Sequence, residues 1–206
     1  MDINIWIILE WIGALFALTG AAIMATRRAK PIIAWGLWII CNAIFIAYFI
    51  YHQQYGLLLM NIGGLFINAF GLYQWIQPKT QINHSITKLL LNLSIFFAVI
   101  SIYHLILFVF SPSKEHIEWF GSMLNLTAAF LLASRHKYSF LCWFVWGVSN
   151  FTLLILTTIT QQYGFAFLQA GFMVVNVYGS ISWLKKFKST HKIPPIEETN
   201  PNPTQT

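Results

Sequence analysis

The stretch WGLWIICN, residues 35–42, returns 108 residues later as WFVWGVSN, residues 143–150. Sliding the chain on itself by this offset aligns residues 10–76 with 118–184 without a gap, and 19 of the 67 aligned positions are identical. A chance alignment of so apolar a composition gives about five or six identities. The matches extend to EWIG and EWFG, to two copies of QQYG, and to NAFGLYQW and NVYGSISW. The sequence therefore predicts a tandem repeat.

The composition indicates that both copies lie in a membrane. Apolar residues make up 57% of the chain and charged residues only 9%, whereas charged residues are about a quarter of a soluble domain. The net charge of +6 comes from Lys and Arg in short loops and the tail, which is typical of topology signals rather than of nucleic-acid binding. We therefore expect an integral membrane protein with lipid, and no nucleic acid, as a partner.

Seven apolar segments have nearly the length of about 20 residues that a helix needs to cross a bilayer. They span residues 5–26, 32–51, 56–77, 88–110, 118–134, 140–159 and 164–184. Only helices satisfy their own backbone hydrogen bonds in lipid, and these segments are too long for barrel strands. The predicted fold class is an all-α integral membrane protein with seven transmembrane helices.

The distribution of basic residues predicts the orientation. With the N-terminus outside, Lys114 alone lies on the outer side, and eleven Lys and Arg lie on the cytoplasmic side. Such an asymmetry favours an N-out, C-in topology. The cytoplasmic residues are Arg27, Arg28, Lys30, Lys79, Lys88, Arg135, Lys137, Lys185, Lys186, Lys188 and Lys192.

The repeat predicts how these helices are organised. Residues 1–77 hold the first three-helix copy, 78–112 a linker and the fourth helix, 113–188 the second copy, and 189–206 a polar, Pro-rich tail expected to be disordered. One helix between the copies restores the original direction, so the copies run parallel about an axis along the membrane normal. A 3+1+3 arrangement of this kind favours a central site between the halves.

Polar side chains on four of the segments are expected to meet near the midplane. Trp35, Trp38 and Asn42 share one helical face by their spacing, and Trp143, Trp146 and Asn150 repeat it. Asn42 lies about ten residues, roughly 15 Å, from the cytoplasmic end of its helix, and Asn68 about twelve residues, roughly 18 Å, from the outer end of its own. The remaining candidates for contact with a solute are Asn61, Gln169, Asn176 and Tyr178.

A structural explanation stays open for each of these candidates. Asn in a membrane helix also serves as a hydrogen-bonding contact between helices, and Trp near a helix end as an interface anchor. Glu10 and Glu118 occupy equivalent positions toward the outer side. They either admit a cation or carry a coupling proton, or they are ordinary interfacial groups.

The interior of every apolar segment lacks Lys and Arg, so a phosphate or carboxylate on the solute would meet no charged clamp. Carboxamides and aromatic faces suit a flat polar ring, neutral or cationic. The sequence shows no metal-ligand spacing, nucleophile motif or phosphate loop, so we expect neither an enzyme nor a cofactor.

The order of these motifs resembles the PnuC family of bacterial vitamin transporters. The second copy carries the pattern best, with Trp143, Trp146, Asn150, Tyr163, Gln169, Asn176, Tyr178, Gly179 and Trp183. The resemblance covers nearly the whole chain and implies a fold related to the SWEET sugar transporters, a place in the bacterial inner membrane, and a homo-oligomer such as a trimer. The chain differs from the usual family pattern, which has an acidic residue shortly before the second-copy Trp pair, because SRHKYSFLCW, residues 134–143, contains none.

These expectations converge on a transporter of a small water-soluble vitamin. The resemblance makes nicotinamide riboside the leading solute, passing by alternating access and facilitated diffusion through a midplane site between the repeats. Thiamine, riboflavin, another nucleoside-like solute or a sugar stay open as alternatives. A non-transporting membrane receptor or scaffold is the alternative of another class.

Overall fold

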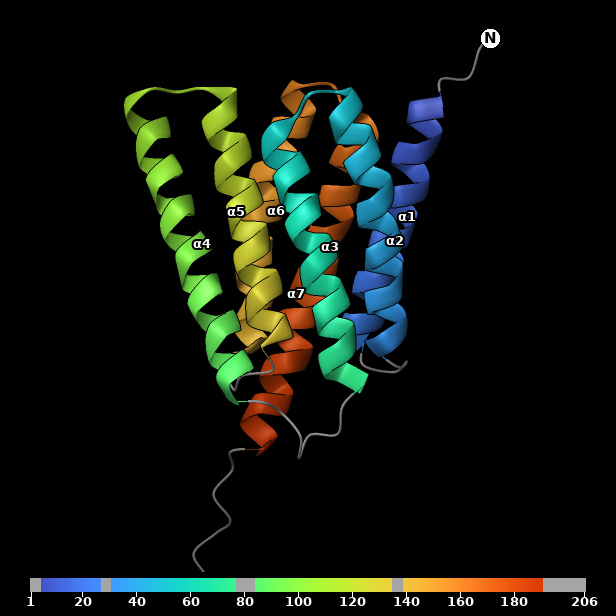
Figure 1. Ribbon diagram of the computed structural model, residues 1–206, viewed down its shortest axis with the longest axis vertical. Helices are drawn as coiled ribbons and strands as arrows, with labels where there is room; N and C mark the ends of the chain where they lie inside the picture. The colour runs from blue at the N-terminus through green and yellow to red at the C-terminus, as the bar shows by residue number, and fades with distance from the viewer. Residues whose placement is uncertain (1–4, 27–30, 77–83, 135–138, 191–206) are drawn as a thin grey trace, which may run out of the picture.

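The computed structural model describes residues 5–26, 31–76, 84–134 and 139–190, all of which lie in helices or short turns. Seven α-helices alternate in direction, so that the turns at 52–54 and 160–162 lie at one end, here called the upper end (Figure 1). The helices are α1 (Ile5–Thr26), α2 (Pro31–Tyr51), α3 (Tyr55–Ile76), α4 (His84–Phe110), α5 (Lys114–Ala133), α6 (Cys142–Ile159) and α7 (Tyr163–Thr190), with a 3-10 turn, η2 (Ser139–Leu141), before α6.

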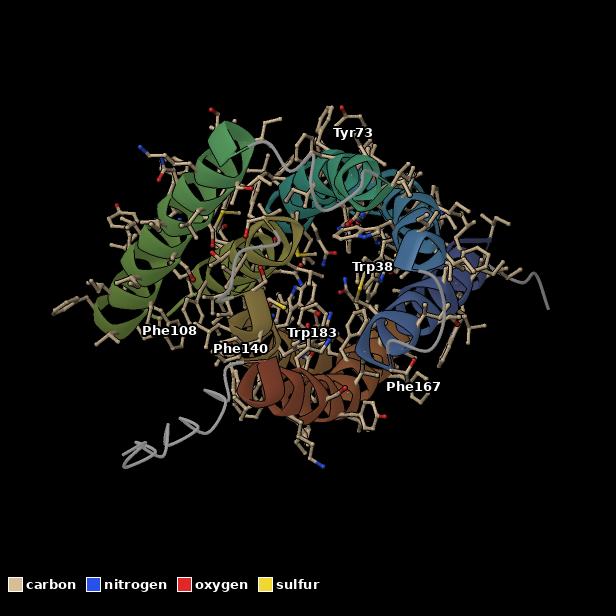
Figure 2. The ribbon with its side chains drawn as sticks, turned by 90° about the horizontal axis from the view of Figure 1, so that it is seen from below. Trp38, Tyr73, Phe108, Phe140, Phe167 and Trp183 are labelled. Carbon is tan, nitrogen blue, oxygen red and sulfur yellow. The ribbon has the colours of Figure 1, made fainter. Side chains whose placement is uncertain are left out.

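Six of the helices form a closed ring, and the seventh lies outside it. Helix α1 packs against α2 and α7, α3 against α2 and α5, and α6 against α5 and α7. Among the described residues, α4 packs only against α5. Seen along the helix axes, the ring surrounds a centre into which Trp38 points, whereas Tyr73 and Phe167 lie on its outside (Figure 2). We call α1–α3 the first half and α5–α7 the second half.

The helices begin and end close to the predicted segments, with three differences. Helix α4 starts at His84 instead of residue 88, so polar residues precede its apolar part. The other two differences are in α5 and α7. Helix α5 starts at Lys114 instead of residue 118, because Ser113 caps it by accepting a hydrogen bond from the His116 backbone N–H at 3.2 Å. Helix α7 continues to Thr190 instead of ending at residue 184. In both cases charged residues extend a helix beyond its apolar part.

Six of the helices are long and apolar enough to span a membrane, and α5 is not among them. Helix α5 carries Lys114, Glu115 and Glu118 near its start. It also packs against α3, α4 and α6, so protein covers most of its surface and its sequence can be less apolar. Elsewhere the bundle exposes large apolar side chains, such as Phe66 (71% exposed) and Val174 (72%), which suits a lipid environment.

Several local features recur at the sequence offset of 108. Gln53 and Gln161 are the described non-glycine residues with positive φ, at 55° and 59°, and each makes the turn before the third helix of its half. A Cβ on Gly63 would lie 2.9 Å from Leu126 of the other half, and one on Gly171 would lie 2.7 Å from Leu18. Gly63 and Gly171 are 108 residues apart, and so are Leu18 and Leu126.

Most of the basic residues that predict the N-out orientation lie outside the described residues, as does the tail from 191 onward.

Candidate functional site

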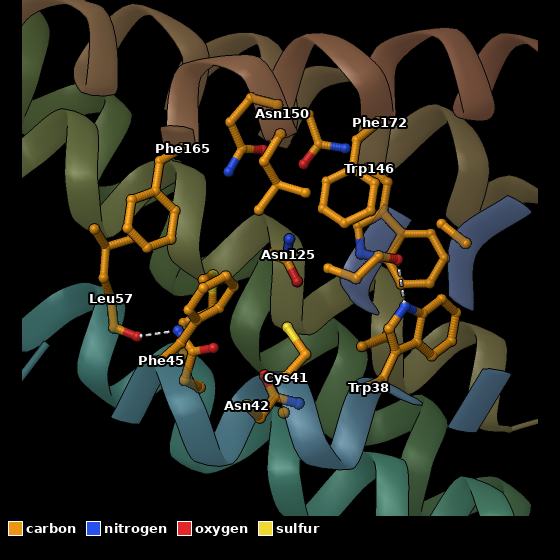
Figure 3. A pocket seen from close by; sticks show the side chains of 18 of the residues that line it. Trp38, Cys41, Asn42, Phe45, Leu57, Asn125, Trp146, Asn150, Phe165 and Phe172 are labelled. Atoms are coloured by element: carbon orange, nitrogen blue, oxygen red, sulfur yellow. Dashed lines mark hydrogen bonds between the residues drawn. The ribbon is translucent and has the colours of Figure 1, made fainter. Parts of the chain in front are cut away.

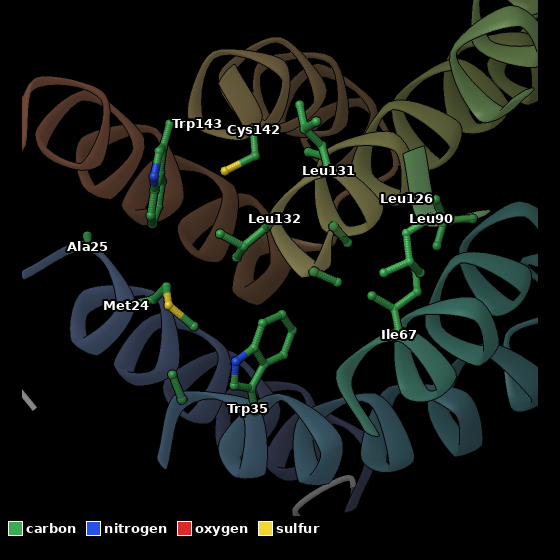
Figure 4. Close-up of a cluster of buried hydrophobic side chains, with 14 of the residues drawn as sticks. Met24, Ala25, Trp35, Ile67, Leu90, Leu126, Leu131, Leu132, Cys142 and Trp143 are labelled. Atoms are coloured by element: carbon green, nitrogen blue, oxygen red, sulfur yellow. The ribbon is translucent and has the colours of Figure 1, made fainter. Parts of the chain in front are cut away.

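Two clusters of buried apolar side chains fill the ends of the ring. The lower cluster includes Met24, Trp35, Ile67, Leu132 and Trp143 (Figure 4). The upper cluster includes Phe45, Phe49, Leu57, Leu153 and Phe165. The middle of the ring is less completely filled, and a cavity lies there.

The cavity has a volume of about 110 Å³, which is room for several water molecules. Six helices contribute to its wall: α1, α2, α3, α5, α6 and α7. Nine of the residues that the sequence singles out line this one cavity. They are Trp38, Asn42, Asn61, Asn68, Trp143, Trp146, Asn150, Gln169 and Asn176 (Figure 3 shows several of them).

Two of the predicted contact residues lie elsewhere. Trp35 is completely buried in the lower cluster, where its ring fills the space beside Gly71; a Cβ on that glycine would lie 2.6 Å from the ring. Tyr178 is 50% exposed on α7 and does not line the cavity. The equivalent of Trp35, Trp143, is as deeply buried but reaches the cavity wall.

The carboxamides in the wall differ in their hydrogen bonds. Asn61 donates from Nδ2 to the Leu57 carbonyl at 2.8 Å, one turn back on its own helix. By contrast, Asn150 Oδ1, Gln169 Oε1 and Asn176 Nδ2 are buried without a hydrogen-bond partner. A buried polar atom left unpaired costs about 1–3 kcal/mol. These three atoms are therefore available to a bound molecule.

Pairs of aromatic rings bring the two halves together on either side of the carboxamides. Trp38 and Trp146 meet edge to face, with centroids 5.9 Å apart, and Trp38 also donates from Nε1 to the Ala17 carbonyl at 3.1 Å. Toward the upper end, Phe45 and Phe165 lie with centroids 4.8 Å apart. The amide-lined part of the cavity thus lies between two ring contacts that cross from one half to the other.

Sequence reasoning missed two polar members of the wall, Asn125 on α5 and Thr157 on α6, and several apolar ones. The apolar residues that the structure adds to the lining include Cys41, Phe45, Phe49, Met60, Phe165 and Phe172. Asn125 could have been noticed as an amide in the middle of an apolar helix. The apolar members carry no such signal, since most of the chain is apolar.

No charged side chain lines the cavity within the described part of the chain. Glu10 and Glu118 lie toward its upper end, where each binds the start of a helix in the other half. Glu10 Oε1 accepts a hydrogen bond from the Phe165 N–H at 2.7 Å, and Glu118 Oε1 accepts one from the Leu57 N–H at 3.0 Å. No group of three or more metal-binding side chains occurs among residues 5–26, 31–76, 84–134 and 139–190.

The comparison with known protein families identifies the chain at family level. The model of the family described as nicotinamide mononucleotide transporter matches residues 7–200. No curated protein and no solved structure matches the chain. A transporter family implies a small-molecule substrate and a multi-pass position in a lipid bilayer, in keeping with the six apolar helices. Because the match covers almost the whole length, the chain belongs to the nicotinamide mononucleotide transporter family, also called PnuC.

Proposed function

We propose that this protein transports nicotinamide riboside across the bacterial inner membrane through the cavity between its two halves. The observation that carries the proposal is the chemistry of the cavity wall, which combines carboxamides and Trp rings with no charged side chain. Amides can donate to and accept from ribose hydroxyls and a nicotinamide carboxamide. The rings can stack on a pyridinium and attract its positive charge.

The same wall favours the riboside over the mononucleotide after which the family is named. A phosphate carries about two negative charges and is usually held by Arg, Lys or a cluster of backbone N–H groups. The described wall contains neither Arg nor Lys. A phosphate placed there would lose its hydration without gaining a compensating partner, which is costly in a largely apolar cavity.

The transport mechanism that we propose rests on the repeat. The recurring sequence, the paired turns at Gln53 and Gln161 and the crossed contacts of Glu10 and Glu118 support two parallel three-helix units joined by α4. We propose seven membrane spans with the N-terminus outside, and rocking of the halves about the central cavity. With no charged side chain in the described wall, facilitated diffusion is the simplest mechanism.

The test is uptake of radiolabelled nicotinamide riboside into proteoliposomes with no proton or sodium gradient. We expect saturable uptake of the riboside that unlabelled riboside inhibits and nicotinamide mononucleotide does not. The Asn68→Leu, Asn176→Leu double variant should abolish it, and normal uptake by that variant would contradict the site. Thiamine, riboflavin and a hexose serve as competing solutes. Saturable uptake of one of them in labelled form, with no saturable uptake of the riboside, would replace the proposed substrate.

A receptor or scaffold on the same fold is the alternative of another class. It would be favoured by midplane amides packed against one another with no space between them. The amides instead border a cavity, which supports passage or binding of a solute. Binding without any uptake in the proteoliposome assay would revive this alternative.

A further inference from the structure

The two halves of the cavity wall are equivalent in sequence position but not in hydrogen bonding. The amide pairs Asn42 and Asn150, Asn61 and Gln169, and Asn68 and Asn176 are each 108 residues apart, and all six residues line the cavity. Asn125 breaks this pattern, because its counterpart in the first half is Ala17. It is the one amide in the described wall without an amide partner at the offset of 108.

The clearest difference between the halves is in the hydrogen bonds made at Asn125 and at its counterpart, Ala17. On the first-half side, the Ala17 carbonyl accepts the Trp38 Nε1–H, so the indole donor is already used. On the second-half side, Asn125 and Trp146 both line the cavity, and neither makes a hydrogen bond with another described residue. Figure 3 shows Asn125 between Asn150 on one side and Cys41 and Asn42 on the other. In the first half, the Ala17 carbonyl and the Trp38 indole are thus already bonded to each other, whereas their counterparts Asn125 and Trp146 are not. Asn42, opposite Asn125, is also without a hydrogen bond to a described residue.

The fully buried polar atoms give an independent indication of the same imbalance. Four such atoms in the cavity wall have no hydrogen-bond partner, and all four belong to the second half: Trp143 Nε1, Asn150 Oδ1, Gln169 Oε1 and Asn176 Nδ2. They comprise two donors and two acceptors. Hydroxyl groups, which both donate and accept, can satisfy such a mixed set.

We infer that Asn125 is a specificity-determining residue, which holds the hydrogen-bonding groups of the solute against α5, α6 and α7 and so fixes its orientation in the cavity. This inference rests on the proposed function for the identity of the solute. Its structural basis is the replacement of Ala17 by an amide at the equivalent position of the second half, in the same wall as the four fully buried polar atoms without a partner, which all belong to that half. The two halves then play unequal roles in binding despite the match between their sequences.

Isothermal titration of the purified full-length protein in detergent tests the inference. Nicotinamide riboside, thiamine, riboflavin and a hexose are titrated separately, and the solute that binds is used for the variants. Asn125→Ala makes the second half match Ala17, and Asn125→Leu keeps the volume without the amide. We expect both to raise Kd about tenfold, as for the loss of one buried hydrogen bond with its partner left unpaired. Asn92→Ala, which removes an exposed amide on α4 outside the ring, is the control and should alter Kd less than about threefold.

Moving the amide to the other wall tests orientation directly. In the Ala17→Asn, Asn125→Ala double variant the number of amides is unchanged, but binding should stay weak, because the unpaired atoms remain in the second half. Restored affinity would overturn the inference, as would an unchanged Kd in Asn125→Ala or Asn125→Leu. Equal melting temperatures of the solute-free wild type and single variants confirm that folding is intact. Binding of thiamine instead of the riboside refutes the proposed substrate alone, and no binding by the wild type refutes both.

Discussion

The carboxylate of Glu10 in α1 accepts a hydrogen bond at 2.7 Å from the backbone N–H of Phe165, in the first turn of α7. Glu118 in α5 makes the matching bond, at 3.0 Å, to the N–H of Leu57 in the first turn of α3. The glycine just before each donating N–H, Gly164 or Gly56, lets the carboxylate approach, since a Cβ there would lie 2.6 or 2.7 Å from it. Each half thus caps a helix of the other half.

Loss of either carboxylate should loosen the upper end of the bundle. The first N–H groups of a helix have no partner within the helix, and a negative charge there is favoured by the helix dipole. We expect Glu10→Ala and Glu118→Ala each to lower the free energy of unfolding by about 1–2 kcal/mol. Thermal unfolding in detergent measures this. Glu115→Ala, which removes an exposed carboxylate on α5, is the control and should have little effect.

A melting temperature unchanged in both Glu10→Ala and Glu118→Ala would show that the crossed caps do not hold the halves together. A large decrease in only one of them would show that the two ends of the pseudo-symmetric contact are energetically unequal. In the first case the two halves would be joined mainly by the packing of α1 on α7 and of α3 on α5.

Glycines beside the buried Trp rings should tolerate no side chain. A Cβ on Gly71 would lie 2.6 Å from the Trp35 ring, and one on Gly179 would lie 2.5 Å from the Trp143 ring. Overpacking of this kind typically costs about 1–3 kcal/mol. We expect Gly71→Ala and Gly179→Ala to lower the melting temperature. Gly36→Ala is the control, because nothing lies within 4 Å of its Cβ position; there the gain in helix propensity should leave stability equal or higher.

The sequence was sufficient for the helices because hydropathy is a strong signal in a membrane protein. It was insufficient where polar residues belong to a helix, as in the first turn of α5, whose start depends on the Ser113 cap. It also could not show that α3, α4 and α6 cover α5, so that this helix can carry Glu118, Asn125 and Thr127. Those residues are acceptable because protein, rather than lipid, surrounds them.

The candidate site could be predicted in part from helical periodicity. Spacing correctly placed Trp38 and Asn42 on one face, and both line the cavity. Spacing could not distinguish Trp35 from Trp38, since which ring enters the cavity depends on the space that Gly71 leaves on the neighbouring helix. Asn125 was missed because the repeat drew attention to identical positions, and this residue differs from its counterpart.

The attachment of α4 provides a third prediction. Two buried hydroxyls of α4 donate to backbone carbonyls of α5: Ser94 to Thr127 at 3.0 Å and Ser101 to Phe120 at 2.9 Å. Because α4 packs on no other described helix, these bonds should matter for its docking. We expect the Ser94→Ala, Ser101→Ala double variant to lower the free energy of unfolding by about 1–3 kcal/mol.

Limited proteolysis in detergent would detect the loosening of α4 as faster cleavage within His84–Phe110. Thr152→Ala, which removes an exposed hydroxyl bonded only within its own helix, is the control. If the double variant and the control resist protease equally, apolar packing alone holds α4 in place.

Gln169 and Asn61 occupy equivalent positions but should respond oppositely to replacement by Leu. Gln169 Oε1 is buried without a partner, whereas Asn61 Nδ2 donates to the Leu57 carbonyl. Removing an unpaired buried acceptor relieves a cost, whereas removing Asn61 forfeits a bond that is already made. We therefore expect Gln169→Leu to raise the melting temperature of the solute-free protein and to weaken solute binding about tenfold or more. Asn61→Leu should lower the melting temperature instead. A solute-free Gln169→Leu protein that is less stable than wild type would mean that Gln169 serves the fold rather than the solute, and that the free hydrogen-bonding capacity of the second half has a different purpose.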